Sequence, residues 1–352
     1  MAEIVIRLLQ DGDIPQINDL YEKAYGKKRS AEKFKWEFQQ GPAGPAIYVV
    51  AIDPDVNKVI GTQCAIPLYV TNPTGEKVLT AKSEDTLVDP AYRGRNVFEK
   101  MYDLLFEESR RAGIVSIWGF TYAIKPFKKL GFEIPFQCNF GLMVFDTAIS
   151  YKYFNALKGS RSFVERLKIA GLVTVSRLKS IARDKRSVPA GYTISHDVQS
   201  NLEQLPPNKS NGFYLQLDTK FLDWRLGKNP YPNNHLYYSL VNDAGVQAAS
   251  VICSHTQEVS YMMHMTFARN LSDETRLNFL ANVISDLSKK TSVLRFWGFV
   301  HNDAGREEIL YLTRSGFLFT NKGISFVWKK LDDSSALNAR NFVLSRMAAQ
   351  GT

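Results

Sequence analysis

Two arginines and a glycine stand where a strand-like run of the sequence passes into a helix-like one. Lys77–Val88 reads as a strand, Val97–Arg111 as a helix, and Arg93-Gly94-Arg95 lies in the loop between them. A helix that starts there presents unpaired backbone N–H groups and the positive end of its dipole. The glycine lets a ligand approach the backbone closely, and the arginines add positive charge. Together these features predict a pyrophosphate site.

A plainer interpretation of this loop stays open from the local sequence. The arginines of an ordinary strand-to-helix turn could simply be solvated. The loop is neither a Walker phosphate-binding loop nor a G-x-G-x-x-G fingerprint. The surrounding elements therefore have to decide between the two interpretations.

The first 145 residues have the pattern of a mixed α/β domain. A strand at 4–9 is followed by helices at about 13–24 and 30–41 and by strands at 46–52, 59–70 and 77–88. After the loop come a helix over 97–112, a strand over 114–120, a short helix that ends at Leu130-Gly131, and one long strand over 132–145. Apolar residues at helical or alternating spacing support each assignment.

Composition sets the class of protein and its compartment. The chain has 352 residues, a hydrophobic fraction of 45% and three scattered cysteines, Cys64, Cys138 and Cys253. Their odd number and apolar surroundings predict buried thiols rather than disulfides or a metal site. No run is long enough to span a membrane, and the start does not resemble a signal peptide. We expect a cytoplasmic protein whose net charge of +9 favours a polyanionic partner, either nucleic acid or an abundant phosphorylated small molecule.

Residues 148–187 form a basic segment with interleaved apolar residues. They hold ten lysines and arginines against Glu165 and Asp184, and they predict amphipathic helices. Such a segment can bind nucleic acid or an anionic membrane. The interpretation we favour is a connector whose apolar face packs on the domains and whose charges are solvated. From residue 161 to 187, where most of the basic residues lie, Phe163 is the only aromatic residue, so a base-stacking surface is not indicated.

The second half of the chain repeats features of the first in the same order. The segments starting at Lys33 and Lys220 are alike, as are Ile114–Phe120 and Val293–Phe299, and Gly131-Phe132 aligns with Gly316-Phe317. Three matches in one order indicate an internal duplication. The basic loop has no counterpart, because the second half has Ser-Asp-Glu-Thr (272–275) at that place.

The order of elements and two motifs resemble the GNAT acyltransferase superfamily. The sequence VDPAYRGRNVFEKMYDLLFEESRRAG resembles the acetyl-CoA-binding segment of that family, and FKKLGFE (127–133) resembles its second signature. The closest subgroup has the pattern DT-x-V-x-P-x-YRG-x-G-x-F. The resemblance covers residues 3–145, and it implies acetyl-CoA as acyl donor, an amine as acceptor, direct transfer and no metal.

The resemblance assigns roles to particular residues of this chain. The backbone of Leu87 and Val88 would hold the pantetheine arm and polarise the thioester carbonyl, and the N–H groups of 94–98 would hold the phosphates. Asp85 is the first choice for the base that deprotonates the amine, and Glu84 is the second. Strand alternation would place these two on opposite faces, so that at most one enters the acceptor cleft. The cofactor-binding residues are then Leu87, Val88, Arg93, Gly94, Arg95, Asn96, Val97, Phe98 and Phe127.

Two departures from the family pattern bear on activity. Asn96 stands where the loop usually has its second glycine, although asparagine tolerates a left-handed backbone better than most residues. Phe127 stands where many members have the tyrosine that protonates the departing sulfur, which leaves Tyr122 as a candidate acid. Thiolate is a tolerable leaving group near neutral pH, because the thiol pKa is ~8.5.

The sequence therefore predicts an α/β (α+β) protein of two GNAT-like lobes, each a mixed, mostly antiparallel twisted sheet flanked by helices. We expect an acetyl-CoA-binding domain at 1–147, a basic helical connector at 148–189, a degenerate GNAT-like domain at 190–333, and a C-terminal helix or tail at 334–352. The expected activity is acetyl transfer to a primary amine of a small molecule such as an amino sugar or a polyamine. The alternative is a non-catalytic binding or regulatory protein that keeps the CoA fold. We expect no nucleic-acid partner, and the oligomeric state is not indicated.

Overall fold

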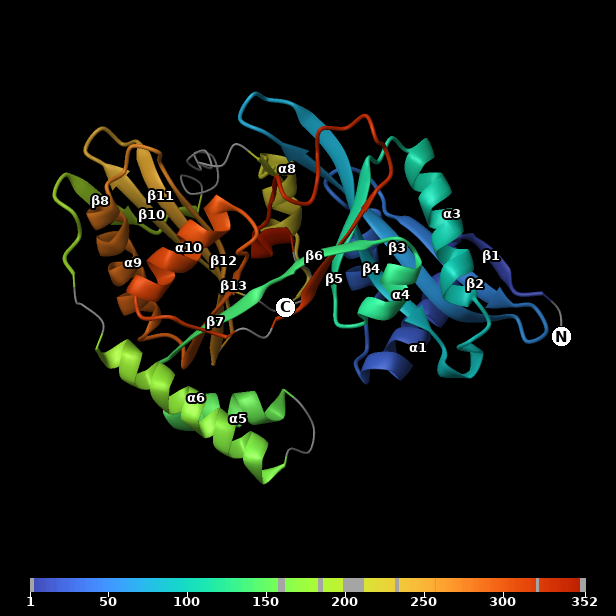
Figure 1. Ribbon diagram of the computed structural model, residues 1–352, viewed down its shortest axis with the longest axis horizontal. Coiled ribbons are helices and arrows are strands. Elements are labelled where there is room, and N and C mark those ends of the chain that lie inside the picture. Colours follow the sequence, from blue (N-terminus) through green and yellow to red (C-terminus); the bar gives the residue numbers. More distant parts are fainter. Residues whose placement is uncertain are drawn as a thin grey trace. The chain divides into compact units, whose positions relative to one another are not determined.

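The chain is described here from a computed structural model, which places residues 3–157, 162–182, 186–198, 212–231, 234–256, 258–320 and 323–348 (Figure 1). Five charged residues of the basic segment lie outside the described residues: Lys158, Arg161, Arg183, Asp184 and Lys185.

The chain forms two compact units, each assembled from separate stretches of sequence. The first unit comprises residues 1–136, 213–231 and 324–342, and the second comprises 137–212, 232–323 and 343–352. The units do not coincide with the contiguous ranges expected from the sequence, because each takes in a strand from the other half of the chain.

The first unit is a twisted sheet with helices on both faces. Its strands follow the order β1 (Val5–Leu8), β2 (Ile47–Asp53), β3 (Lys58–Thr71), β4 (Lys77–Val88), β5 (Ser116–Thr121), β15 (Ser325–Lys330) and β6 (Glu133–Gln137), and β9 (Phe213–Leu215) pairs with β3. The helices are α1 (Ile14–Tyr25), α2 (Ala31–Phe34), α3 (Val97–Arg111) and α4 (Ile124–Lys129). The pairs β1–β2, β2–β3, β3–β4 and β5–β15 are antiparallel, whereas β4 and β5 are parallel.

Successive side chains of the strands point alternately into the two hydrophobic cores of the first unit. On β2, Val49 and Ala51 join the core under α3, whereas Tyr48 and Val50 join the core under α1 and α2. This period of two is what an extended strand between two helical layers requires. The sheet is thereby fixed from both sides where the loop after β4 begins.

The second unit has a sheet of the same design. Its order is β14 (Leu318–Thr320), β7 (Asn139–Val144), β13 (Val293–Gly298), β12 (Val259–Phe267), β11 (Gln247–His255), β10 (Asn234–Asn242) and β8 (Tyr192–Ser195). Here too one neighbouring pair, β12 and β13, is parallel. Its helices are α5 (Thr147–Ala156), α6 (Phe163–Ile181), α9 (Asp273–Leu287) and α10 (Asp303–Arg314).

The seven strands along the main path of each sheet match in order, which confirms the expected pair of GNAT-like lobes, but the sheets exchange one strand each. In the first sheet β15 lies between β5 and β6, and in the second β7 lies between β13 and β14. The expectation of one long strand over 132–145 was therefore wrong, since β6 and β7 are separate strands in different sheets (Figure 1). Alternating apolar residues run through both strands, so the pattern gave no sign of the break at Cys138.

The repeat is also visible in a local irregularity. The predicted helix over 30–41 is a short α-helix that passes into a π-helix, Lys35–Gln39, and the second half has the same arrangement in α8 (Thr219–Leu222) and the π-helix Asp223–Gly227. Trp36 and Trp224 stack with ring centroids 5.2 Å apart. Each indole Nε1 donates to the other residue's backbone oxygen, at 2.8 and 2.9 Å.

Several further expectations can be compared with the structure. The cysteines are free and buried, as predicted. None of the helices in the described part of the chain is long and apolar enough to cross a membrane. Within the same described ranges, His, Cys, Asp and Glu side chains form no group of three or more that could hold a metal ion.

Candidate functional site

The site in the first unit begins where two parallel strands part. Strands β4 and β5 are paired at Ala81–Ile117 and Lys82–Trp118. Gly119 follows in β5, where a Cβ atom would lie 3.1 Å from the backbone oxygen of Ser83. Beyond this point a cavity of about 630 Å³ runs between the strand ends to the loop before α3. Gly119 is a signal that the sequence did offer, because a glycine inside a strand often marks close approach of backbone.

A β-bulge changes the direction of side chains at the end of β4. The pairing with β3 shifts register between Thr62 and Cys64, and Asp85 has a φ of 51°. The Thr62 hydroxyl donates to the Asp85 backbone oxygen at 2.7 Å and holds this kink. Alternation is broken there, so Glu84 and Asp85 both line the cavity. The expectation that at most one of the two side chains enters the acceptor cleft stays a prediction, although the regular strand that it assumed is interrupted by this bulge.

The loop after β4 is held by an aspartate at its start. Asp89 accepts from the backbone N–H of Ala91 at 3.1 Å and from the Lys23 ammonium at 2.9 and 3.0 Å. The hydrogen bond from Lys23 lowers the pKa of Asp89. Tyr92 adds a second anchor by donating to Asp53 at 2.6 Å. The loop is thus fixed directly before the arginine-glycine pair.

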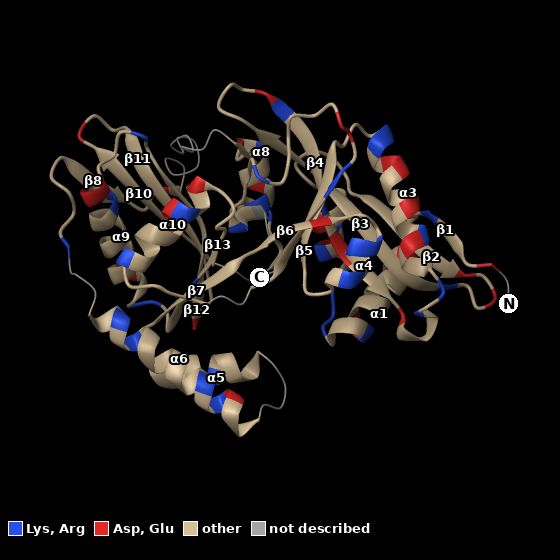
Figure 2. Cartoon of the chain, in the orientation of Figure 1, with Lys and Arg blue, Asp and Glu red and all other residues tan. Residues whose placement is uncertain are grey.

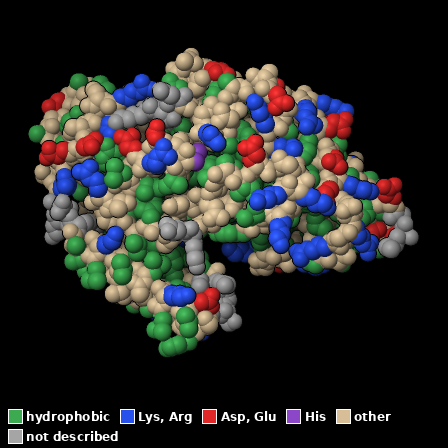
Figure 3. Space-filling model, viewed as in Figure 1, with side chains coloured by type: hydrophobic (Ala, Val, Ile, Leu, Met, Phe, Trp, Pro, Cys, Tyr) green, Lys and Arg blue, Asp and Glu red, His purple; other side chains and the backbone are tan. Residues whose placement is uncertain are grey.

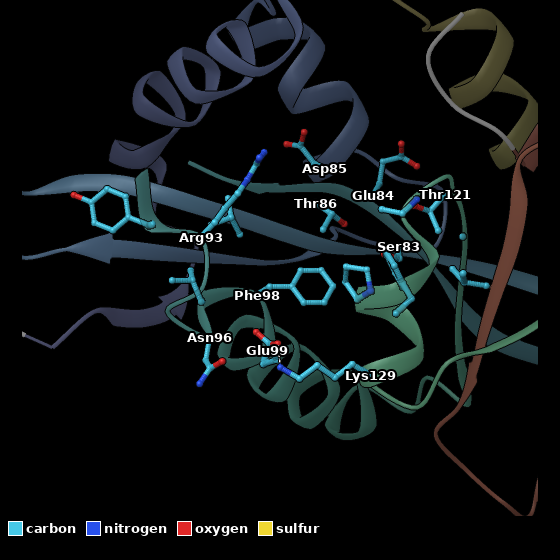
Figure 4. A pocket seen from close by; sticks show the side chains of 18 of the residues that line it. Ser83, Glu84, Asp85, Thr86, Arg93, Asn96, Phe98, Glu99, Thr121 and Lys129 are labelled. Atoms are coloured by element: carbon cyan, nitrogen blue, oxygen red, sulfur yellow. Dashed lines mark hydrogen bonds and ion pairs between the residues drawn. The ribbon is translucent and has the colours of Figure 1, made fainter. Parts of the chain in front are cut away.

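Two left-handed residues turn the loop into the helix. Gly94 has a φ of 79° and Asn96 a φ of 55°. An asparagine at the second position keeps the turn that a glycine would make, as expected from its tolerance of this geometry. Helix α3 then starts at Val97. Figure 4 shows Arg93 and Asn96 at this end of the cavity, with the first helical turn beside them.

Most of the residues expected at the site line the cavity. They are Glu84, Asp85, Val88, Arg93, Gly94, Asn96, Val97, Phe98 and Phe127. Leu87 instead points into the core under α1 and is buried. The Arg95 guanidinium lies over the Tyr92 ring, 5.0 Å from its centroid. Tyr122 is not part of the lining, and its side chain is exposed, with 73% of its surface accessible.

The carboxylate of Asp85 is engaged in a buried ion pair. Arg29 contacts it at 2.8 Å, and the side chains of this pair are only 2% and 3% exposed. The Tyr48 hydroxyl donates to the same oxygen at 2.5 Å. Burial lowers the pKa of Arg29, but its attraction to and hydrogen bond with Asp85 outweigh this and raise it overall. Asp85 is therefore committed to internal partners.

Glu84 is the more accessible of the two carboxylates. A third of its side-chain surface is exposed, and its partner is the ammonium group of the buried Lys82. Figure 4 shows Glu84, Asp85 and Thr86 along the same stretch of strand at the cavity. A carboxylate that reaches the cavity while an ammonium group holds it from behind is suited to hydrogen-bond a bound cation.

A third carboxyl group, on the π-helix of the first unit, interacts with these two. Glu37 is 6% exposed. Burial raises the pKa of Glu37 to about 8, and the charges of Glu84 and Asp85 contribute to the rise. The sequence gave no reason to select this residue, since it lies in an amphipathic helical segment among buried aromatics.

A buried hydroxyl network behind the cavity also escaped the sequence analysis. Ser83 lines the cavity, and its hydroxyl contacts the Tyr102 hydroxyl at 2.8 Å and accepts from the Gln63 amide at 3.0 Å. Thr86 donates to the same Gln63 side chain. Ser83 could have been suspected only from its position one residue before Glu84.

Aromatic and aliphatic side chains form the remaining wall. Phe98 and Phe127 lie in edge-to-face contact, with centroids 5.8 Å apart, and Val327 of β15 joins them in the lining. Lys129, on the other side of the cavity, pairs with Glu99 at 2.6 Å (Figure 4). An apolar wall beside cationic groups and free N–H groups suits a ligand with an anionic head and a less polar arm.

The corresponding place in the second unit is occupied by acidic side chains. Helix α9 is capped by Ser272, whose hydroxyl accepts from the Thr275 N–H at 3.1 Å. Asp273 and Glu274 lie in the first turn, and Asp273 also accepts from the Tyr311 hydroxyl at 2.5 Å. Carboxylates at this helix start repel a phosphate instead of attracting it.

Comparisons with known proteins agree with the fold. Residues 5–134 match the family model described as an acetyltransferase (GNAT) domain. A search of curated proteins by sequence found no significant match. The matched segment includes β4, the arginine-glycine loop and α3, and ends within β6.

Solved structures similar to this chain extend the likeness to both units. A probable N-acyltransferase from Enterococcus faecalis V583 is 12% identical, with a TM-score of 0.63 and coverage of 94% of this chain and 73% of that one. A tandem GNAT protein from the clavulanic acid biosynthesis pathway is 14% identical, with a TM-score of 0.57 and coverage of 95% and 100%.

A third similar structure carries a long-chain acyl donor. It is the Saccharomyces cerevisiae N-myristoyltransferase with bound myristoyl-CoA, 10% identical, with a TM-score of 0.59 and coverage of 93% of this chain and 83% of that one. At these identities the likeness establishes the fold, which is a tandem GNAT arrangement. Residues 5–134 therefore match a GNAT acetyltransferase domain, and the likeness of the whole chain to the tandem GNAT protein is a likeness of fold.

Proposed function

We propose that the chain transfers an acetyl group from acetyl-CoA to a primary amine of a small molecule, within a ternary complex in the first unit. The observation that carries this proposal is the course of the cavity. It runs from the start of α3, where Arg93 and Gly94 lie, to Glu84 between the parted strands β4 and β5. The cavity thus joins an anion-binding end to a carboxylate-bearing end.

In this proposal the donor follows the cavity along its length. The pyrophosphate binds the N–H groups of 94–98 with help from Arg93. The pantetheine arm lies along the backbone of Leu87 and Val88 and against Phe98 and Phe127. The thioester then reaches the bulge at Asp85, where backbone groups released from regular pairing can polarise its carbonyl.

The amine has to lose a proton before it attacks, because an alkylammonium pKa is near ~10. We assign Glu84 as the group that accepts this proton, since its carboxylate reaches the cavity and that of Asp85 is held by Arg29 and Tyr48. The amine nitrogen bonds to the carbonyl carbon, the carbon–sulfur bond then breaks, and the extra proton left on the nitrogen passes to the released sulfur. CoA leaves as the thiolate, which needs no strong acid at position 127 because the thiol pKa is ~8.5.

The acceptor in this proposal is a small cation. Glu84 gives the cavity its accessible carboxylate, and Tyr25 joins the lining with an apolar ring and a polar hydroxyl. An ammonium group is attracted to carboxylates and to the faces of aromatic rings. Amino sugars and polyamines both fit this description.

The competing proposal is a protein that binds acyl-CoA without turning it over. The engaged state of Asp85 and the phenylalanine at position 127 favour it. Incubation with acetyl-CoA and a panel of amines, with release of free thiol as readout, separates the two. Turnover that disappears in Glu84→Gln while acetyl-CoA still binds supports the transferase. Binding without thiol release for any amine supports the scaffold.

A further inference from the structure

Helix α6 presents a second apolar face that nothing in the described structure covers. Its inner face packs on β7 and α5 through Ile169 and Val173. The hydroxyls of Ser176 and Ser180 lie on that face as well, and Ser180 donates to the Val144 oxygen at 2.7 Å. The sequence of the basic segment predicted one apolar face, which would pack on the domains. The structure confirms that face and adds another.

The exposed face is made of large side chains. Phe163 is 75% exposed, Leu178 61% and Ile181 63%. Three further residues are 46–58% exposed, namely Val164, Leu167 and Val175. We call these six residues the outer stripe. At about 100° per residue they fall within an arc of about 120°, roughly opposite the packed face, over a length of about 27 Å. Figure 3 shows hydrophobic side chains gathered on the surface over α5 and α6.

Basic residues flank the outer stripe on both sides. On the helical wheel Arg166 and Arg177 border one edge, and Lys168 and Lys179 border the other. Glu165 is the only acidic residue of α6, and it belongs to the capping box with Ser162 (Figure 2). Large contiguous apolar patches are uncommon on the surface of soluble proteins, and they mark sites of interaction.

This pattern selects one kind of partner. We propose that α6 docks in the plane of an anionic lipid surface, with the outer stripe in the boundary between head groups and acyl chains and the flanking arginines and lysines at the phosphates. An apolar centre between two basic borders matches the layers of such a surface. A nucleic acid would call for charge at the centre and for stacking aromatics, and α6 has only Phe163.

The proposal concerns lying on a membrane and not crossing it. It does not depend on acyl transfer, because α6 belongs to the second unit and the cavity to the first. Binding strength in this mode grows with the apolar area inserted and with the attraction to anionic lipids.

Flotation of the full chain with lipid vesicles tests the proposal. The chain should bind vesicles made of equal parts of phosphatidylglycerol and phosphatidylcholine. It should hardly bind vesicles made of phosphatidylcholine alone. The double variant Leu167→Glu, Leu178→Glu should lower binding at least roughly tenfold. Replacing Lys168 and Lys179 by glutamine should lower binding to the anionic vesicles roughly fivefold for each charge removed. High salt should also lower this binding, because it screens the attraction.

Leu310→Glu is the matched control, because Leu310 is 55% exposed on α10, outside α6. It should bind like the natural chain, and thermal melts should show that every variant is folded. Equal binding by the stripe variant, equal binding to neutral vesicles, or no binding to anionic vesicles would each overturn the proposal. A dimer in light scattering that the stripe variant abolishes would assign the face to a second copy and overturn it as well.

Discussion

At the scale of single residues, neighbouring carboxylates at the end of β4 have opposite surroundings. Asp85 is in a buried ion pair with Arg29, whereas Glu84 reaches the cavity. Only the carboxylate that reaches the cavity can interact with a bound ligand, and that carboxylate belongs to Glu84. The sequence pattern favoured Asp85, because it occurs in the subgroup motif. Its carboxylate is held by Arg29, in the loop after α1, and by Tyr48 of β2, which favours a positioning role for Asp85.

The first prediction separates these roles. Glu84→Gln should lower kcat roughly 10²-fold at neutral pH and recover partly at alkaline pH, where free amine is plentiful. Asp85→Asn should instead destabilise the fold by about 3–5 kcal/mol, because it leaves the buried Arg29 without its counter-ion. Thiol-release kinetics and urea unfolding measure the two effects. Glu107→Gln, an exposed carboxylate of α3, serves as control. A pH–rate profile that Glu84→Gln leaves unchanged would remove Glu84 from the mechanism.

Glu37 supports a second prediction, about pH and stability. Burial raises its pKa to about 8 in the folded chain, against ~4.3 when unfolded. The folded state therefore keeps this proton over a range in which the unfolded state has lost it. The free energy of unfolding should then fall as the pH rises from about 4 to 8.

Glu37→Gln stays neutral and should escape this loss. The difference in the free energy of unfolding between Glu37→Gln and the natural chain should therefore grow with pH. At pH 9 the variant should be more stable by a few kcal/mol. Urea unfolding at pH 5, 7 and 9 measures the difference. A difference that is the same at all three values contradicts the assigned pKa.

At the scale of elements, the site depends on a strand from the far end of the sequence. Strand β15 lies between β5 and β6 and pairs with β5 from Ser325–Thr121 to Lys330–Ser116. Its Val327 lines the cavity, and its Phe326 and Trp328 are buried. Each buried aromatic contributes roughly 1.5–3 kcal/mol.

A fragment that ends at residue 147 should therefore neither fold cooperatively nor bind acetyl-CoA, because β5 and β6 would be left as open edges. Coexpression with residues 148–352 should restore both properties, provided that β15 pairs with β5 and β6, and β7 with β13 and β14. Circular dichroism and calorimetry provide the readout. A fragment that melts cooperatively and binds with the affinity of the full chain would contradict the assigned role of β15.

The sequence predicted the elements around the cavity better than their pairing. Strand β4, the loop and α3 followed from local patterns, because caps, turns and apolar periodicity are local signals. The bulge at Asp85 was missed, since register depends on the partner strand β3. The strand exchange was missed for the same reason, because consecutive strands usually pair with each other.

At the scale of the whole molecule, the chain is a duplicated fold in which one copy has the loop proposed to bind the anion and the other does not. The first unit has Arg93 and the left-handed Gly94 before α3, and the second has Asp273 and Glu274 at the start of α9. Three matching segments were enough to recognise the duplication from the sequence. The acidic replacement was also visible there, and it predicts one donor per chain.

Calorimetric titration of the full chain with acetyl-CoA tests the central claim most directly, in the natural chain and in Gly94→Val. Valine is strained at a φ of 79° and would block the approach of the pyrophosphate. Gly75→Val is the matched control, because Gly75 has a φ of 85°, lies in the turn between β3 and β4, and does not line the cavity. We expect one equivalent per natural chain, normal binding by Gly75→Val and none by Gly94→Val. Two equivalents, or unchanged affinity in Gly94→Val, would contradict the account.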